Sequence, residues 1–512
     1  MMATALDRLP TEILSQIIGE LPVYSYDDGS EFKAIAMPHT RDLRLVNRAV
    51  SAVASSFALR TVPFVMGKRD FRLLEGIANH EANRHHVIQL MYHVRQLDPK
   101  ILSLERYTTA IKTQMLMDSP DSPFCFRTEC PDQDGPQCKW VKSDDEIHED
   151  YQQYLRIHQQ QQDILDKYHD YEVLRRVVAK LPRLRNLTVS SCQQLGYYQK
   201  PSPVLPWRTG RSREVYLGRY DTRAAVRHLH ALLHGVQEAG TRLQHLSASK
   251  IYFSLFEPDV FLGPRYGLHT IFNLFDNLTN FSFEVKALDE CSSGRLEDDD
   301  QDYDEESQIK LCRMTMAKGI LRRILDNAPN LATIDLRFTG DFEPMTYHDG
   351  PWRYPCFTAA AKLGHVLPLN RVYPHLHTIY LMNMETERQE IGRFLFRHKK
   401  TLKSFTLEDM VLKRTSWVQL IRDLRDKFHD AGLKRAEIRG LIRGVSEDEE
   451  HEAEIADLGI VHGDPWEPTS SLLSKYITSP EPQPKGHPLE PGYIYGFGDD
   501  DSESSLSNDD SD

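Results

Sequence analysis

One sequence unit recurs seven times between residues 184 and 438, and it limits the folds open to this chain. Each unit has a leucine, two variable residues, an apolar residue, one variable residue and a second apolar residue. Apolar residues at every second position predict a β-strand with one buried face. The units are LRNLTV (184–189), LQHLSA (243–248), LTNFSF (278–283), LATIDL (331–336), LHTIYL (376–381), LKSFTL (402–407) and LKRAEI (433–438).

Helical patterns precede most of these units. They cover residues 224–236, 311–325, 391–396 and 417–428. Strands that alternate with helices predict parallel strands joined by helical crossovers. The units start 26 to 59 residues apart. The shorter spacings fit a repeat of one strand and one helix with a period of about 20–29 residues, and the longer ones imply insertions.

Composition divides the chain into four regions. Residues 1–65 hold short apolar-periodic helices, 66–180 are mainly helical, and 181–445 carry the repeated unit. Residues 446–512 are rich in proline and then in acidic residues. Because this last region has little apolar surface to offset the entropy cost of ordering, we expect it to be disordered.

Charge and cysteine content restrict the partners and the compartment. The formal net charge is -13, which argues against a general nucleic-acid or anionic-membrane binder. No run approaches the roughly 18 apolar residues of a transmembrane helix, and the N-terminus does not resemble a secretory signal. The seven cysteines are scattered and do not form a disulfide framework. These features predict a cytoplasmic or nuclear protein.

Motifs for catalysis and for metal binding are missing from the sequence. It has no phosphate-binding glycine-rich loop and no nucleophile elbow. His80 and His85 are five residues apart, whereas a zinc-protease helix needs a spacing of four. Cys125, Cys130 and Cys138 lack the paired spacing of structural zinc sites. We therefore expect no catalytic residue, no metal and no cofactor.

The N-terminal region contains two short motifs in order. Residues 6–22 (LDRLPTEILSQIIGELP) and 42–53 (DLRLVNRAVSAV) resemble the two halves of an F-box. The shared features are an LP dipeptide, an apolar helix ending near a second LP, and an L-x-L-V-x-R helix. Two features depart from the family pattern. The connecting loop, residues 23–38, is longer than usual, and Val50 stands where many F-boxes carry an aromatic residue.

The F-box resemblance implies a docking surface. An F-box is a three-helix unit too small to bury its own apolar surface, and it docks on a Skp-family adaptor that bridges to a cullin scaffold. The alternative is an ordinary buried helical hairpin. The residues that would contact the adaptor are Leu9, Pro10, Ile13, Leu14, Ile17, Leu21, Leu43, Leu45, Val46 and Val50.

As a whole, the chain resembles fungal F-box proteins with irregular leucine-rich repeats. This resemblance implies an α/β repeat fold, in which a three-helix F-box and a helical linker precede a curved solenoid of parallel strands and an acidic tail. Solenoids present their strands to protein partners. The side chains that we expect to be exposed there for substrate binding are Arg337, Tyr380, Glu408 and Arg439.

The expected function is that of a non-catalytic, substrate-recognition subunit of a Skp–cullin–F-box ubiquitin ligase. The adaptor binds the F-box, and the repeats bind an unidentified protein substrate. The alternative is a scaffolding repeat protein whose F-box-like helices cap the N-terminal end of the repeats. An enzyme is a third and more distant reading, because no nucleophile, metal or phosphate motif has the required spacing.

Overall fold

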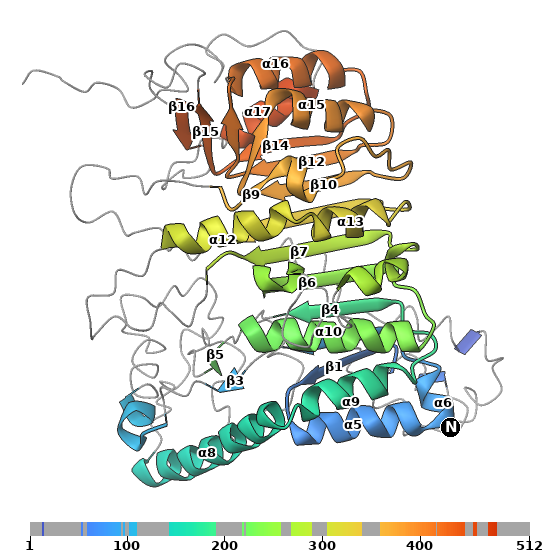
Figure 1. Ribbon diagram of the computed structural model, residues 1–512, viewed down its shortest axis with the longest axis vertical. Coiled ribbons are helices and arrows are strands. Elements are labelled where there is room, and N and C mark those ends of the chain that lie inside the picture. Colours follow the sequence, from blue (N-terminus) through green and yellow to red (C-terminus); the bar gives the residue numbers. More distant parts are fainter. Residues whose placement is uncertain are drawn as a thin grey trace, which may run out of the picture. The chain divides into compact units, whose positions relative to one another are not determined.

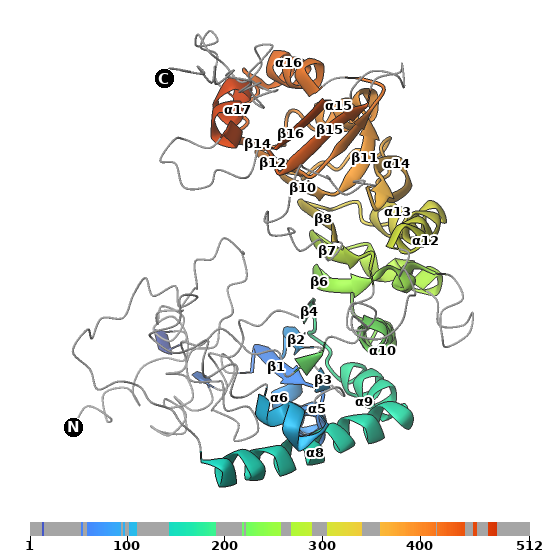
Figure 2. The same cartoon turned by 90° about the vertical axis from the view of Figure 1, so that its left-hand side faces the viewer.

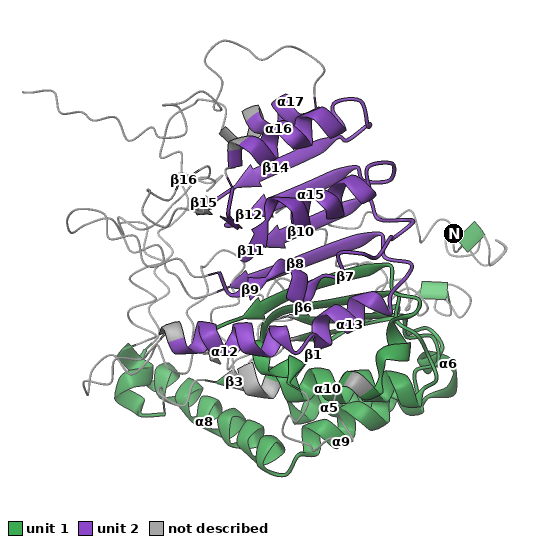
Figure 3. Ribbon diagram, turned by 45° about the horizontal axis from the view of Figure 1, so that its top comes forward, with its two compact units in different colours: residues 1–303 green, residues 304–512 purple. Residues whose placement is uncertain are grey.

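The computed structural model divides the chain into two compact units, residues 1–303 (unit 1) and 304–512 (unit 2) (Figure 3). Each unit is an α/β arrangement with a mostly parallel sheet. The structure describes residues 13–14, 53–54, 59–93, 96–97, 102–109, 143–190, 218–219, 222–257, 268–288, 305–339, 359–415, 417–445, 454–457 and 469–478.

Unit 1 is built on parallel strands that each hydrogen-bond to the next strand along the chain (Figure 1). In order, they are β1 (Thr61–Val65), β2 (Gln89–His93), β4 (Asn186–Ser190), β6 (His245–Tyr252) and β7 (Asn280–Lys286). A separate short antiparallel pair is formed by β3 (Gln96–Leu97) and β5 (Gly218–Arg219).

The helices of unit 1 provide the crossovers that parallel strands require. They are α5 (Lys68–Asn79), α6 (Glu81–Arg84), α8 (Asp144–Asp166), α9 (His169–Val178) and α10 (Thr222–Glu238), with 3-10 turns at Phe253–Phe256, Leu268–Thr270 and Phe272–Phe275. Helix α10 packs against both α9 and β6. Its side chains are therefore buried around most of the helix, from Ala225 to Val236.

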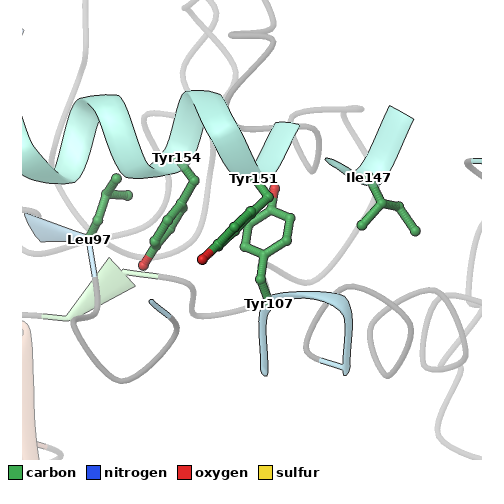
Figure 4. Close-up of a cluster of buried hydrophobic side chains, with 5 residues drawn as sticks. All are labelled: Leu97, Tyr107, Ile147, Tyr151 and Tyr154. Atoms are coloured by element: carbon green, nitrogen blue, oxygen red, sulfur yellow. The ribbon is translucent and has the colours of Figure 1, made fainter. Parts of the chain in front are cut away.

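Helix α8 has its own small core (Figure 4). Tyr151 and Tyr154 project from the helix toward Tyr107, with ring centroids 5.4 and 5.3 Å from that of Tyr107. Leu97 and Ile147 complete the cluster. At its N-terminus the helix has a capping box, in which Ser143 and Glu146 each accept a hydrogen bond from the other's backbone N–H. This cluster holds the long polar helix against Leu97 and Tyr107.

Unit 2 contains two adjoining sheets. The first is parallel, with strands β8 (Thr333–Thr339), β10 (Thr378–Met382), β12 (Ser404–Glu408) and β14 (Arg435–Arg439). The second has β9 (Ala361–Lys362), β11 (Met384–Glu387), β13 (Val411–Lys413), β15 (Leu441–Val445) and β16 (Glu454–Asp457). Only the pairing of β15 with β16 is antiparallel among these described strands.

In three repeats of unit 2, a left-handed residue directly follows the strand of the first sheet. Asn383 separates β10 from β11, Gly440 separates β14 from β15, and Asp409 directly follows β12. All three adopt a left-handed backbone, with φ of 56°, 72° and 52° respectively. The chain therefore turns at the same step in each of these repeats and passes from the first sheet to the second.

Figure 2 shows α12 to α15 on one side of the first sheet of unit 2. The helices of unit 2 are α12 (Glu305–Ala317), α13 (Ile320–Asp326), α14 (Leu363–Val366), α15 (Arg388–Arg397), α16 (Trp417–Phe428) and α17 (Thr469–Thr478). No helix in the described part of the chain is long and apolar enough to cross a membrane.

All seven repeated units form strands, as expected, and they do so in one register. Each strand begins two residues after the first leucine of its unit, so Thr333, Thr378, Ser404 and Arg435 are aligned. The three apolar positions of every unit are buried, with side chains at most 6% exposed. The period-two pattern therefore marks the core face of both units.

Two further strands extend the unit 1 sheet beyond the seven expected ones. Strand β1 follows Leu59 in LRTVPF (59–64), and β2 follows Val87 in VIQLMY (87–92). Both segments have the same spacing of apolar residues as the repeated unit. The first segment starts with leucine but contains a proline, which is uncommon inside a strand, and the second starts with valine in place of leucine.

Some expected elements differ in extent. The helical pattern at 311–325 is two helices, because Gly319 adopts a left-handed backbone between α12 and α13. The long pattern at 144–181 is likewise broken at Tyr168, between α8 and α9. Strand β16 and helix α17 lie within residues 446–512, where we expected disorder. Helix α17 is ordered because Leu473, Tyr476 and Ile477 form one buried stripe.

Two repeats of unit 2 carry a buried methionine at the step where a leucine-rich repeat would have a polar residue. The leucine-rich pattern places asparagine or cysteine nine residues into the unit. Met384 and Met410 occupy this position here, and both are fully buried. A thioether fills space without forming the hydrogen bonds of an asparagine ladder. At the turns of these repeats, the backbone N–H groups of Asn383 and Asp409 donate to the carbonyls of Glu408 and Arg439, at 3.0 and 3.2 Å.

Candidate functional site

The outer face of the first sheet of unit 2 gathers the polar residues of its strands. Along each strand, buried side chains alternate with more exposed ones. Figure 2 shows helices α12 to α15 on one side of this sheet, and the more exposed side chains belong to the opposite face. We call this surface the ladder face. Its residues are Thr333, Asp335, Arg337, Thr378, Tyr380, Met382, Ser404, Thr406, Glu408, Arg435, Glu437 and Arg439.

The four residues expected to contact a substrate form one cluster on the ladder face. The guanidinium carbon of Arg337 lies 4.1 Å from the centre of the Tyr380 ring, a cation–π geometry. Arg439 donates from one terminal nitrogen to the Tyr380 hydroxyl, at 2.8 Å, and from Nε to Glu408 Oε2, at 2.7 Å. The Tyr380 hydroxyl in turn donates to the same Glu408 oxygen. Tyr380 is thus the centre of the cluster.

The cluster changes the acid–base properties of two of its members. Burial and the hydrogen bond to the negatively charged Glu408 raise the pKa of Tyr380 to about 12. Burial alone would lower the pKa of Arg439, but its hydrogen bond to Tyr380 and the charge of Glu408 outweigh burial and raise it. Both groups therefore keep their protons at neutral pH, and the hydrogen-bond pattern is fixed.

The ladder face also holds polar residues that the sequence analysis did not select. Asp335 accepts two hydrogen bonds from Arg337, at 2.9 and 3.0 Å. Glu437 pairs with Arg435 at 2.5 Å and accepts from Thr406 Oγ1 at 3.2 Å. Their position in the repeated unit could have identified them. Asp335 and Glu437 each stand two residues before an expected substrate-contact residue, and alternate residues of a strand lie on the same face. The face is a continuous set of paired charges.

Comparisons with known proteins do not assign this surface. No family model and no curated protein matches the chain. The fold and the geometry of the ladder face are therefore the basis for its interpretation.

The equivalent outward positions of unit 1 have a different chemistry. Two rows of its strands carry amide, hydroxyl, imidazole and apolar groups, and the described residues of these rows include no lysine, arginine, aspartate or glutamate. The rows are Thr61, Gln89, Asn186, His245 and Asn280, and Pro63, Met91, Thr188, Ser247 and Ser282. A third row includes Val65 in β1 and Glu284 in β7, so unit 1 also carries an acidic residue at the step that holds Arg337, Glu408 and Arg439 in unit 2.

Two of the expected adaptor-contact residues fall within the described part of the chain. Both are helical, but Ile13 is 42% exposed whereas Leu14 is 2% exposed. Nearby in the sequence, Val53 and Ala54 are also buried. The adaptor-contact residues outside the described ones are Leu9, Pro10, Ile17, Leu21, Leu43, Leu45, Val46 and Val50.

Metal-binding groups are absent from the described part of the chain, where no three His, Cys, Asp or Glu side chains are placed to hold an ion. His80 caps helix α6, and its Nδ1 accepts a hydrogen bond from the Asn83 backbone N–H at 3.3 Å. Cys125, Cys130 and Cys138 lie outside the described residues.

Proposed function

We propose that this protein is a substrate-recognition subunit of a Skp–cullin–F-box ubiquitin ligase. The N-terminal helices bind a Skp-family adaptor, and the ladder face binds the protein to be ubiquitylated. The chemistry of ubiquitin transfer then belongs to other subunits, in the cytoplasm or the nucleus.

The observation that carries this proposal is the cluster around Tyr380. Its residues come from β8, β10, β12 and β14, so four repeats hold one aromatic ring between two arginines. Tyrosine and arginine are the side chains most enriched at the energetic centres of protein interfaces. A rigid sheet also orders these side chains in advance, which lowers the entropy cost of binding a partner.

Ile13 supports the adaptor half of the proposal. Its aliphatic side chain is 42% exposed, next to a buried leucine in the same helical turn, and is therefore accessible to a partner. Truncation of a residue that contributes strongly to an interface costs more than about 1 kcal/mol, at least a roughly fivefold loss of affinity.

The alternative function, a scaffolding repeat protein with an N-terminal cap, has an observation of its own. Leu14, Val53 and Ala54 are all buried within the chain. Residues 53 and 54 precede β1, whose outer edge has no partner strand among the described residues. Solenoids need such terminal caps for solubility. In this case the same helices would cover the end of the sheet.

Co-expression of the full-length chain with a Skp-family adaptor tests the two functions. We expect the proteins to co-purify, and Ile13→Ala, alone or with Leu9→Ala, to weaken the complex about tenfold. The thermal stability of Ile13→Ala should stay near that of the wild type. Leu14→Ala, at a residue that is also an expected contact but is buried, should in contrast lower stability by about 2–5 kcal/mol. Absence of a complex, or a complex that tolerates both substitutions at Leu9 and Ile13, would favour the scaffold.

A further inference from the structure

The charges of the ladder face are arranged in two layers. Its three arginines and three acidic residues balance in number. Their exposures do not balance. The side chains of Arg337, Arg439 and Arg435 are 41%, 39% and 61% exposed. Those of Asp335, Glu408 and Glu437 are only 18%, 21% and 19% exposed. The acids lie beneath, and the guanidinium groups form the outer layer that a partner meets.

The inner acids orient this outer layer. Asp335 holds Arg337 through two hydrogen bonds, and Glu408 holds Arg439 through Nε. Tyr380 contacts both arginines, by its ring on one side and by its hydroxyl on the other. A guanidinium presents its N–H donors in a fixed fork. The inner layer thus holds both arginines in position, while the side chains of Arg337 and Arg439 remain 41% and 39% exposed.

From these two observations we infer that the ladder face binds an acidic segment of its protein partner, with carboxylates seated on Arg337 and Arg439. This inference rests on the proposed function, because it names the chemistry of the substrate bound by the same site. Arginine forks match the planar geometry of carboxylates. Within a chain of net charge -13, a basic outer layer also directs an acidic segment to one surface.

Unit 2 offers a second basic surface, which serves as the internal comparison. On the helix side, Arg322, Arg323 and Arg371 line a hollow of about 290 Å³ together with Asp326 and Asn370. Arg322 donates to the Gly364 carbonyl, at 3.2 Å, and Arg371 pairs with Asp326, at 3.3 Å. This hollow has no aromatic ring among its lining residues. Removal of two arginines here changes the net charge as much as removal of two from the ladder face.

Binding of fluorescent peptides to the full-length chain tests the inference, with short oligoglutamate as the probe and oligoglutamine and oligolysine as the comparisons. We expect oligoglutamate to bind more tightly than the other two, and its binding to weaken at high salt. The double variant Arg337→Gln/Arg439→Gln should lose affinity about tenfold. The control Arg322→Gln/Arg371→Gln should stay within about twofold of the wild type.

A gain of affinity separates binding from misfolding. Glu437→Gln removes one negative charge from the inner layer, so oligoglutamate should bind about twofold more tightly. A misfolded protein would not produce this gain. The inference is overturned if oligoglutamate binds no better than oligoglutamine, if the hollow variant loses affinity in place of the ladder-face variant, or if Glu437→Gln weakens binding. Co-purification with the adaptor is a separate measurement. Loss of adaptor binding would therefore contradict the ligase role without changing the result of the peptide assay.

Discussion

Asp409 and Gly440 occupy the same step of neighbouring repeats, and the carboxylate of the first fills the space beside the α-carbon of the second. An ideal β-carbon on Gly440 would lie 2.9 Å from Cγ of Asp409 and nearer still to Oδ1. The Asp409 backbone N–H also donates to the carbonyl of Arg439, at 3.2 Å. This contact fixes the turn between the two sheets of unit 2 where Arg439 joins the ladder face.

Gly440→Ala should therefore destabilise unit 2 for two reasons. A left-handed backbone at a residue with a β-carbon costs about 1–2 kcal/mol, and the overlap with Asp409 adds about 1–3 kcal/mol. Gly432→Ala is the matched control, because Gly432 has φ of 70° but no atom within 4 Å of its ideal β-carbon. Urea unfolding should show a larger loss for Gly440→Ala than for Gly432→Ala. Equal losses would mean that Asp409 does not restrict the turn.

Tyr380 should titrate later than an ordinary tyrosine. Burial and the bond to Glu408 raise its pKa to about 12, above the unfolded value of about 10. Because the folded state favours the neutral hydroxyl, its contribution to stability is complete below pH ~10 and is lost as the pH rises to about 12. Alkaline titration by tyrosinate absorbance should show a step near pH 12 that Tyr380→Phe lacks. If Tyr380→Phe instead lacks part of the wild-type step near pH 10, Tyr380 titrates like an ordinary tyrosine and the hydrogen bond to Glu408 is contradicted.

Asp170 should be essential to the core of unit 1. It is fully buried and accepts hydrogen bonds from Arg227, at 2.7 and 3.0 Å, and from His228, at 2.5 Å. Loss of one partner from a buried ion pair costs about 3–5 kcal/mol, which we expect for Asp170→Asn in urea unfolding at neutral pH. Glu75→Gln removes a carboxylate from the more exposed pair with Arg176 and should cost less than about 1 kcal/mol.

The contribution of Asp170 should also depend on pH. Burial alone would raise its pKa, but the hydrogen bond and charge of His228 and the charge of Arg227 lower it below the ordinary value. A lowered pKa in the folded state gives stability that is present above the unfolded value of about 4 and is lost as the pH falls through the folded value. The difference between the wild type and Asp170→Asn should therefore shrink in acid. A difference that stays constant from neutral to acid pH would contradict this assignment.

Helix α17 should protect the last strand of the ladder. Its residues Leu473, Tyr476 and Ile477 are buried, and Ser474 Oγ accepts a hydrogen bond from the Ala436 backbone N–H of β14, at 3.2 Å. We expect Ile477→Ala to cost about 2–5 kcal/mol and to speed amide exchange along β14. Lys475→Ala, on the same helix but not in the buried stripe, is the control. Unchanged exchange in Ile477→Ala would show that β14 does not need this cover.

Local sequence patterns determined the strands of the repeats. The apolar residues of a unit such as LHTIYL are two residues apart, and this spacing forces one face of a strand toward the core whatever its neighbours are. The same reasoning placed Tyr380 and Arg337 on the outward face. The sequence pattern was a poorer guide to where helices break. Gly319 is a common helix terminator, whereas nothing local marks Tyr168 as the left-handed residue between α8 and α9.

The partners of those outward residues depended on tertiary structure. Arg439 reaches Tyr380 across 59 positions of the chain, and Glu408 lies between them only because β12 lies between β10 and β14. Neighbouring parallel strands are about 4.8 Å apart, so a fixed register brings side chains from distant repeats into hydrogen-bond range. The sequence by itself determined which residues face outward, through the period of the strand. Only the order and register of the strands decided that these residues meet, because helical crossovers of unequal length separate them along the chain.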